Sequence, residues 1–495
     1  MSMRKLRKIL ACLILVITTL LPVSEARADV ASYYTYTYDI YDEALASPDA
    51  YKVQDVIFGS DIGIGNFNNP MGIFAKDELV YILDTGNNRI VVVNRDFELV
   101  KVIESVVIDG EESELSGPQD IFIDNNGDMY ICDTANQRIL HTDKDLNFIR
   151  MYTKPDDEHF AESNVFSPTK CVADEAGRLY VLATNVNRGL VVFDSDGEFT
   201  SFMGANPVKA SFFDVLKKRL MTKEQRQRMI QFVPTEYSNV AIDSEDFIYA
   251  TTTTFNQSDL INNPDRVNPI RKLNSLGDDI LIKNGYYNPI GDMQWGTAAD
   301  ISGPSRLTDV TALDNDTYFA IDRVRGRIFG YDFQGNLLYA FGGVGNRRGY
   351  FEYPIGIESI GTDLLVLDNR TNSVTRFTLT EYGKLINNGL LEYKRGRYDQ
   401  SAEYFRQVLE YNGNYDLAYI GIGRALLRQE EYEEAMKYFK VKKDYQNYSK
   451  AFQQYRKEWV EANIGFLVAG LVVLFVGFKL LGFLKRKVWG GANKE

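Results

Sequence analysis

The stretches Tyr81-Ile-Leu-Asp-Thr-Gly-Asn-Asn-Arg89 and Tyr130-Ile-Cys-Asp-Thr-Ala-Asn-Gln-Arg138 are two copies of one motif, the blade motif. A looser third copy is Tyr180-Val-Leu-Ala-Thr-Asn-Val-Asn-Arg188, and the copies begin 49 and 50 residues apart. Each copy combines a short apolar β run, a polar turn and a second β run. A repeat of this length and content is typical of a four-stranded β-propeller blade.

Six such units can be placed within residues 29–380. Their second strands are expected at 80–84, 129–133, 179–183, 247–252, 317–322 and 363–368. Longer spacings flank the fourth unit and indicate two insertions, of which 208–229 has the apolar periodicity of an amphipathic helix. The sixth unit lacks a fourth strand before helical sequence begins, so we expect segment 53–58 to supply it and close the ring. The chain is therefore predicted to be mainly β, with a six-bladed propeller over residues 29–380.

The blade motif supplies aspartates and arginines at repeating positions, and a structural role for them is favoured. Aspartate accepts hydrogen bonds from turn N–H groups, and arginine can pair with a carboxylate of a neighbouring blade. These blade-turn residues are Asp84, Arg89, Asp133, Arg138, Arg188, Asp322, Arg327 and Asp368.

The blade motif resembles the NHL repeat, with the weakest match in the fourth unit. Related six-bladed propellers include calcium-dependent lactonases of the gluconolactonase-like group, and the resemblance implies carboxylate and amide ligands near the channel mouth. The Glu-Gly-Pro of that group is replaced here by Asn69-Pro70-Met71. Several oxygen ligands lie near predicted first strands, and their spacing selects no defined metal set: Asn69, Gln119, Asp120, Asn239, Asp309 and Glu358.

Other catalytic chemistry has little support in the sequence. A propeller of the peptidyl-α-hydroxyglycine lyase kind binds metal through histidines, but only His141 and His159 are present, which excludes a multi-histidine zinc site. Neither a Gly-x-Ser-x-Gly elbow nor a Walker loop occurs. Cys132 and Cys171 fall in adjacent predicted blades, either as a disulfide or as two separate buried thiols. We expect no catalytic residue and no cofactor, with Ca²⁺ as the alternative.

Residues 384–460 change to helical periodicity with pairs of like residues 34 positions apart. This offset resembles the tetratricopeptide repeat, which implies two helical repeats that either present a peptide groove or act as a stiff spacer. The repeat positions are Gly389, Tyr398, Phe405, Tyr419, Gly423, Tyr432, Ala435 and Phe439.

Both ends of the chain are predicted to be targeting or membrane segments. Residues 1–28 combine basic residues, an apolar core and a small-residue cleavage site, which is typical of a secretory signal peptide. Residues 464–484 are apolar except for Lys479 and are long enough to form one transmembrane helix. The tail, 485–495, begins with three basic residues and is expected in the cytoplasm by the positive-inside rule. We therefore expect a single-pass protein of the cell membrane with its N-terminal bulk extracytoplasmic.

The charge of the chain restricts its partners. The net charge is −13, and it becomes −17 after residue 28 because residues 1–28 hold five basic residues and one acidic residue. An acidic surface argues against nucleic acid. The layout resembles bacterial surface NHL proteins associated with carbohydrate uptake systems. It predicts a binding or scaffold protein whose propeller recognises a protein, peptide or glycan and whose helical repeats contact a membrane complex. The alternative is a calcium-dependent lactonase.

Overall fold

The computed structural model describes residues 34–39, 41, 43–157, 160, 165–184, 186, 188–204, 237–255, 267–283, 289–292, 303–313 and 315–491. The predicted signal peptide, 1–28, and the predicted helical insertion, 208–229, lie outside these residues.

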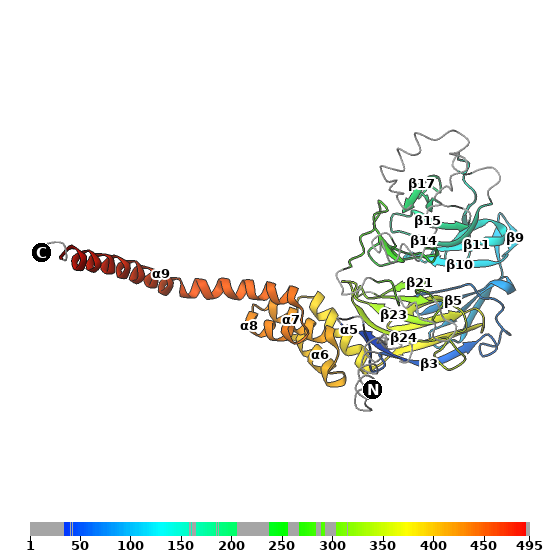
Figure 1. The fold of residues 1–495 in the computed structure, drawn as a ribbon. Helices are drawn as coiled ribbons and strands as arrows, with labels where there is room; N and C mark the ends of the chain where they lie inside the picture. The colour runs from blue at the N-terminus through cyan, green and yellow to red at the C-terminus, as the bar shows by residue number, and fades with distance from the viewer. Residues whose placement is uncertain are drawn as a thin grey trace, which may run out of the picture. The chain divides into compact units, whose positions relative to one another are not determined.

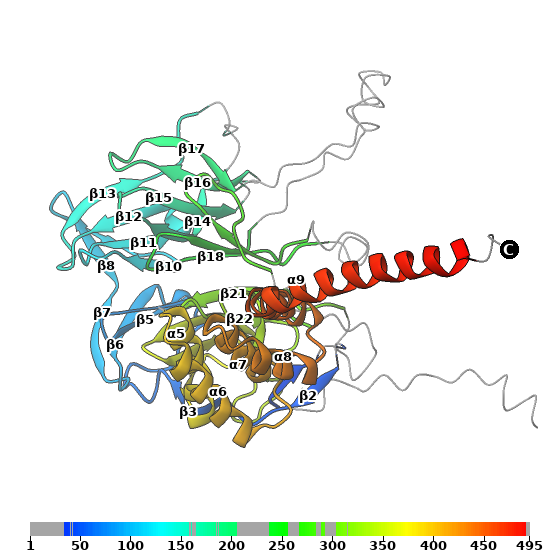
Figure 2. The same cartoon turned by 90° about the vertical axis from the view of Figure 1, so that its left-hand side faces the viewer.

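Six antiparallel sheets form the blades of a β-propeller, and within each sheet consecutive strands are neighbours (Figures 1 and 2). The first three blades are β4 (Gly72–Lys76), β5 (Leu79–Asp84), β6 (Arg89–Asn94) and β7 (Leu99–Ile103); β10 (Pro118–Ile123), β11 (Met129–Asp133), β12 (Arg138–Thr142) and β13 (Phe148–Tyr152); and β14 (Ser167–Ala173), β15 (Leu179–Thr184), β16 (Gly189–Phe193) and β17 (Phe199–Gly204). The other three contain β18 (Asn239–Ile242), β19 (Ile248–Thr251) and β20 (Ile270–Leu273); β21 (Leu307–Ala312), β22 (Tyr318–Asp322), β23 (Arg327–Tyr331) and β24 (Leu337–Gly342); and β25 (Pro354–Ile360), β26 (Asp363–Asp368) and β27 (Ser373–Leu379).

The first strands of the six blades form a closed ring. β4 contacts β10, and the contacts continue through β14, β18, β21 and β25 back to β4. The sixth blade takes its fourth strand from the N-terminal side of the chain, since β3 (Tyr51–Phe58) pairs with β27. This strand covers the segment 53–58 that the sequence assigned to ring closure. The predicted fold class, a six-bladed propeller followed by helices, is confirmed.

Three local features depart from a uniform blade. In the described residues the fourth blade has three strands. The fifth has six, because β1 (Tyr36–Tyr38) pairs with β24 and β2 (Ala44–Ala46) pairs with β1. A hairpin of β8 (Ser105–Ile108) and β9 (Glu111–Glu114) lies between the first two blades.

Five helices follow the propeller: α5 (Glu381–Lys394), α6 (Tyr398–Tyr411), α7 (Asp416–Arg428), α8 (Tyr432–Val441) and α9 (Tyr445–Gly491). The 34-residue repeat has a packing cause. The Phe405 ring packs against Gly389, where an added Cβ would lie 3.0 Å from a ring carbon, and Phe439 packs against Gly423 in the same way at 2.6 Å. Glycine at these positions lets an aromatic side chain of the next helix approach the backbone.

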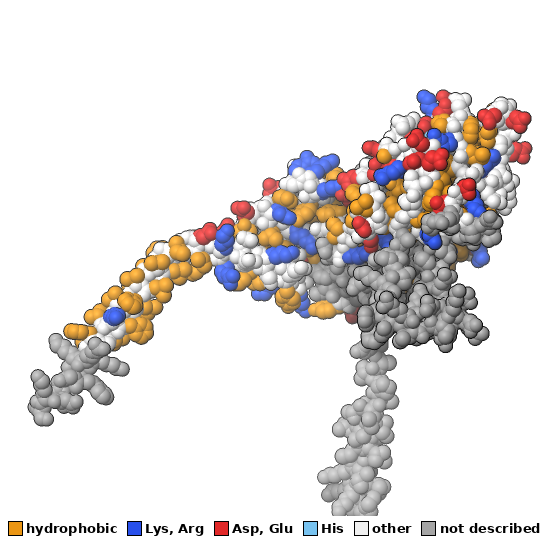
Figure 3. Space-filling view, turned by 90° about the horizontal axis from the view of Figure 1, so that it is seen from above, with side chains coloured by type: hydrophobic (Ala, Val, Ile, Leu, Met, Phe, Trp, Pro, Cys, Tyr) orange, Lys and Arg blue, Asp and Glu red, His pale blue; other side chains and the backbone are white. Residues whose placement is uncertain are grey.

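α9 is one continuous helix that passes from the repeats into the apolar segment. Its span Tyr445–Leu484 contains a window with a mean hydropathy of 2.5 and none of that window is buried, so it is long and apolar enough to cross a membrane. Figure 3 shows hydrophobic side chains covering the outer part of this helix.

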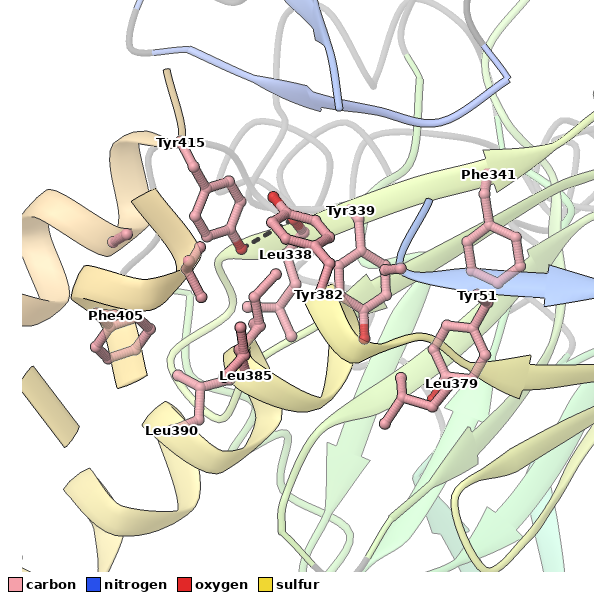
Figure 4. Packing of buried hydrophobic residues seen from close by; sticks show 14 of the residues in the cluster. Tyr51, Leu338, Tyr339, Phe341, Leu379, Tyr382, Leu385, Leu390, Phe405 and Tyr415 are labelled. Atoms are coloured by element: carbon pink, nitrogen blue, oxygen red, sulfur yellow. Dashed lines mark hydrogen bonds between the residues drawn. The ribbon is translucent and has the colours of Figure 1, made fainter. Parts of the chain in front are cut away.

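One hydrophobic core extends from the fifth and sixth blades into the helices (Figure 4). On the propeller side it includes Tyr51, Tyr339 and Phe341, and on the helical side Tyr382 and Phe405. The propeller and the helical repeats therefore share buried apolar surface, which is the main stabilising contribution in folding.

Candidate functional site

The blade-motif aspartates organise the turns of their own blades. Asp84 accepts hydrogen bonds from the Asn68 amide at 2.7 Å and the Asn87 side chain at 2.8 Å, and its carboxylate lies 2.7 Å from Arg89 Nε. Asp133 repeats these contacts at the same distances with the residues of its own blade. Because both aspartates are fully buried and their oxygens are already engaged, they contribute to the architecture of the turn.

The expected pairing of arginine with a neighbouring blade is wrong. Arg89 and Arg138 bind the aspartates of their own blades, because each arginine is the cross-strand partner of that aspartate in the hairpin. Arg188 has Ala183 in place of the aspartate, and its guanidinium lies 5.7 Å from the Phe202 ring centroid.

The last two blades keep the aspartate but not this arginine contact. Arg327 donates hydrogen bonds to the backbone carbonyls of Tyr34 and Gly342. Asp322 instead lies 3.6 Å from Arg325 Nη1. Asp368 accepts hydrogen bonds from four turn amides between residues 352 and 371.

The threonine of the blade motif connects adjacent blades, a role that sequence reasoning missed. Thr85 donates a hydrogen bond to the Pro118 carbonyl of the next blade at 2.6 Å, and Thr134 donates to the Pro168 carbonyl at 2.7 Å. The signal was present in the sequence, because threonine follows the aspartate in both good copies of the motif.

A cavity of about 580 Å³ lies inside the ring and is lined by the first strands of the blades. This volume is in the range of small-molecule pockets. Of the six candidate oxygen ligands, the structure brings four to the cavity wall: Asp120, Asn239, Asp309 and Glu358. Asn69 and Gln119 do not line it, and Asn69 instead accepts a hydrogen bond from Asn369 at 2.9 Å.

A lysine that sequence reasoning missed stands among these groups. Lys170 Nζ lies 3.0 Å from Asp120 Oδ1, and both residues line the cavity. Lys170, Asp120 and Asp309 occupy corresponding positions, each as the first residue after a bulge in its strand. The sequence carries this signal, because Lys170 follows Pro168 by two residues as Asp120 follows Pro118.

Most oxygens of the channel carboxylates already have protein partners. Asp120 Oδ2 accepts from the Cys171 amide at 2.9 Å, and Asp309 accepts from the amides of Val310 at 2.7 Å and Ile357 at 2.8 Å. Glu358 Oε1 accepts from the Thr311 hydroxyl at 2.9 Å and the Ser359 amide at 2.8 Å.

Burial shifts the protonation of this cluster. It raises the pKa of Asp120, raises the pKa of Asp309 to about 6 and raises the pKa of Glu358 to about 8. Burial alone would lower the pKa of Lys170, but the carboxylates of Asp120 and Asp309 outweigh it and raise this pKa. At neutral pH the raised pKa favours the protonated form of Glu358, and Lys170 is charged.

This donor set does not fit a resident Ca²⁺ ion. Calcium requires several free carboxylate or carbonyl oxygens, whereas Lys170 already supplies a positive charge at Asp120 and the oxygens of Asp309 accept backbone hydrogen bonds.

The mouth of the cavity is acidic. It is formed by turns that join first and second strands, and these contribute Asp124, Glu175, Asp243 and Asp246 together with Lys76. Asp246 accepts from the Glu175 amide at 3.3 Å, and burial with neighbouring carboxylates raises the pKa of Asp246.

Three of the four histidines and cysteines named from the sequence of the propeller are packed among other side chains. His141 stacks on Tyr130 with ring centroids 4.1 Å apart, and burial lowers the pKa of His141. His159 lies outside the described residues. Cys132 and Cys171 are free and buried.

One face of the helical repeats is occupied by the propeller itself. Tyr415 donates a hydrogen bond to the Leu338 carbonyl at 3.0 Å (Figure 4). Arg424 donates to the Gln334 side chain, and Lys394 pairs with Asp316 in the turn between β21 and β22. Two polar contacts and one ion pair thus border the shared core.

The repeat positions predicted from the sequence hold the helices together or lie on their surface. Ala435 and the two phenylalanines are buried, Tyr398 packs on Tyr393 with centroids 5.5 Å apart, and Lys442 Nζ lies 4.8 Å from the Tyr419 ring centroid.

Residues 386–445 match the tetratricopeptide repeat family. This segment is a tetratricopeptide-like repeat pair. No curated protein sequence matches the chain.

Similar solved structures include virginiamycin B lyase from Staphylococcus aureus, with 14% identity, 67% of this chain and 100% of that chain covered, and a TM-score of 0.38. A streptogramin B lyase is similar with 11% identity, the same coverage and a TM-score of 0.38. A protein of unknown function from Bacteroides thetaiotaomicron has 10% identity, coverage of 63% and 70%, and a TM-score of 0.41. These likenesses are too distant to bear on function.

Proposed function

We propose that this chain is a membrane-anchored extracytoplasmic binding protein that holds its propeller in a fixed relation to a membrane complex. The propeller would bind a protein, peptide or glycan, and the complex would be of the carbohydrate-uptake kind. The tail after the apolar helix would lie in the cytoplasm, in agreement with its basic residues.

The core shared by propeller and helices carries the proposal. Tetratricopeptide repeats that present a peptide groove need an open face, but here Tyr382, Leu385 and Leu390 pack in one cluster with Tyr51 and Tyr339 of the propeller. The repeats are thus a rigid link, which favours the spacer role over the groove. Because α9 continues from the repeats into the apolar segment, the link reaches the anchor without an intervening loop.

The channel mouth is the surface we assign to the ligand. Leu313 lines the cavity and lies at the start of the turn in which Asp316 pairs with Lys394 of α5, so the mouth and the helices meet at the same end of the propeller. A ligand at the mouth would be close to whatever the helices contact.

Site-specific crosslinking tests the proposal. A photoreactive residue at the exposed Asn125, in a turn of the mouth, should crosslink the full chain to integral membrane proteins in cells. The control is Ala135, exposed in a turn at the opposite end of the strands. Equal crosslinking from both positions, or capture of no membrane protein from Asn125, would refute the proposed role. Protease access to the propeller in intact cells tests its sidedness.

A second candidate function, hydrolysis in the channel, is favoured by the protonated Glu358 beside Asp309 and Lys170. A carboxyl group with a pKa near neutrality can act as a general acid. Lactone hydrolysis by the full chain should then be lost in Glu358→Gln and should not require Ca²⁺. Turnover that disappears in this variant while folding is retained would replace the binding role with an enzymatic one.

A further inference from the structure

Cys132 and Cys171 are close neighbours across the boundary between the second and third blades. Cys132 lies on β11 and Cys171 on β14, and these two strands contact each other. The two Sγ atoms and a carboxylate oxygen of Asp120 all lie within 4.8 Å of one another. The Cys171 thiol donates to the Tyr130 carbonyl of the second blade at 3.6 Å.

From this juxtaposition we propose that Cys132 and Cys171 form a disulfide that links the second and third blades in the mature protein. The proposal rests on the extracytoplasmic location argued above, because only an oxidising compartment maintains such a bond. Cys12 lies in the predicted signal peptide, so these two are the whole complement of cysteines after residue 28. The two Sγ atoms lie within 4.8 Å of each other. Rotation of the two side chains can bring them to the S–S bond length of about 2.05 Å.

A metal site made of the same residues is the competing arrangement, and the contacts argue against it. A metal would need both thiolates at a site that solvent does not reach, and it would need a free oxygen of Asp120. Both oxygens of Asp120 are engaged, one by Lys170 Nζ and the other by the Cys171 amide. A disulfide requires neither a buried negative charge nor a ligand from Asp120.

The bond forms by thiol–disulfide exchange with a disulfide oxidant, either a small molecule or an oxidoreductase. One cysteine thiolate attacks a sulfur of the oxidant and expels one thiolate, and the second cysteine thiolate attacks the mixed disulfide and releases the other. Two protons leave the protein thiols and two electrons pass to the oxidant. Because Cys132 is 0% and Cys171 is 1% exposed, the exchange takes place during folding, before the blades close.

The bridge would also hold one wall of the channel. The Cys171 amide binds Asp120, and Asp120 binds Lys170, so fixing the position of Cys171 fixes this pair as well. The two cysteines are 39 positions apart, and closing such a loop in the unfolded chain shifts the folding equilibrium by about 10²–10³-fold in the chain-entropy model.

Mass spectrometry of the full chain tests the bond. The protein is solubilised from its native membranes with excess N-ethylmaleimide, denatured in it and digested without reductant. The expected result is one linked pair of unlabelled peptides containing Cys132 and Cys171, which separate and accept two labels after reduction. Reduction should also lower the melting temperature of the wild type by several degrees and leave that of Cys132→Ser unchanged.

Two labels without reduction would overturn the proposal, and so would a stoichiometric metal ion that is lost in the variant with both Cys132→Ser and Cys171→Ser. Refolding the full chain with reduced and oxidised glutathione then identifies the failed premise. If the bridge forms in the refolded protein but not in the protein from native membranes, the propeller does not lie in an oxidising compartment. The extracytoplasmic side assigned to it in the proposed function is then wrong. Absence of a bridge there refutes the pairing and leaves the proposed function standing.

Discussion

Replacing Glu358 by glutamine should flatten the dependence of stability on pH. Glu358 Oε1 accepts two hydrogen bonds that a glutamine oxygen can keep, so the substitution removes the titration with little change in packing. Burial raises the pKa of Glu358 from 4.5 to about 8. An acid whose pKa is raised on folding stabilises the protein at low pH, and this stability is lost as the pH rises from 4.5 through 8.

The size of the effect follows from linkage. A shift of one pKa unit corresponds to about 1.4 kcal/mol in the free energy of unfolding. Most of the change that the shift of Glu358 causes in this free energy falls between about pH 5 and pH 9. The free energy of unfolding of the wild type should therefore fall by about 2–4 kcal/mol over this range. Asp309, whose pKa is raised to about 6, adds a change of the same sign at the acidic end.

Urea unfolding of the full chain in detergent, followed by circular dichroism at a series of pH values, measures this slope. Above about pH 6 the Glu358→Gln variant should lose less stability than the wild type as the pH rises. The control is Glu352→Gln, which removes an exposed carboxylate just before the same strand. Equal slopes for the wild type and Glu358→Gln would show that Glu358 is ionised at neutral pH, and the assignment of a protonated acid to the channel would fail.

Three further substitutions test other contacts. Lys170→Met leaves buried carboxylates without their cation, which should lower the free energy of unfolding by about 3–5 kcal/mol. Ca²⁺ should raise the melting temperature of this variant but not of the wild type. Equal stabilisation of both would contradict the idea that Lys170 replaces a metal. Tyr415→Phe removes a buried hydrogen bond to the propeller and should lower the free energy of unfolding by about 1 kcal/mol. Proteases should then cleave the chain between the propeller and the repeats faster, and an unchanged cleavage rate would count against a rigid link. Thr134→Val removes the hydrogen bond to the Pro168 carbonyl and should lower the free energy of unfolding in urea by about 1 kcal/mol. The control, Thr184→Val at an exposed position, should leave it unchanged. Similar losses in both variants would show that the threonine of the blade motif does not join adjacent blades.

The sequence predicted the ring well because the blade motif records local structure. Its aspartate, turn residues and arginine contact one another within a single hairpin, so their spacing along the chain is the same in the first two blades. The 34-residue spacing of Gly389 and Gly423 was equally informative, since each glycine accommodates one aromatic ring.

The channel could be predicted only in part, because its residues meet through the closure of the whole ring. The sequence predicts oxygen donors at Asp120, Asp309 and Glu358. A search for oxygen donors passes over Lys170, although its spacing from Pro168 matches that of Asp120 from Pro118. Its place depends on a bulge in β14, and a bulge changes which side of a strand a residue faces. The packing of the repeats against the fifth and sixth blades also depends on tertiary contacts that no local pattern records.

The strand that pairs with the ring-closing strand β3 is also the strand through which the propeller is tethered. β27 pairs with β3 from Tyr51 opposite Leu379 to Phe58 opposite Ser373, and it leads directly into α5. A pull on the anchor is therefore carried along the chain to this seam, beside the contacts of the shared core. Removal of β3 would both open the ring and weaken the attachment of the propeller to the anchor. In this protein the integrity of the ring and its mechanical connection to the anchor depend on the same pair of strands.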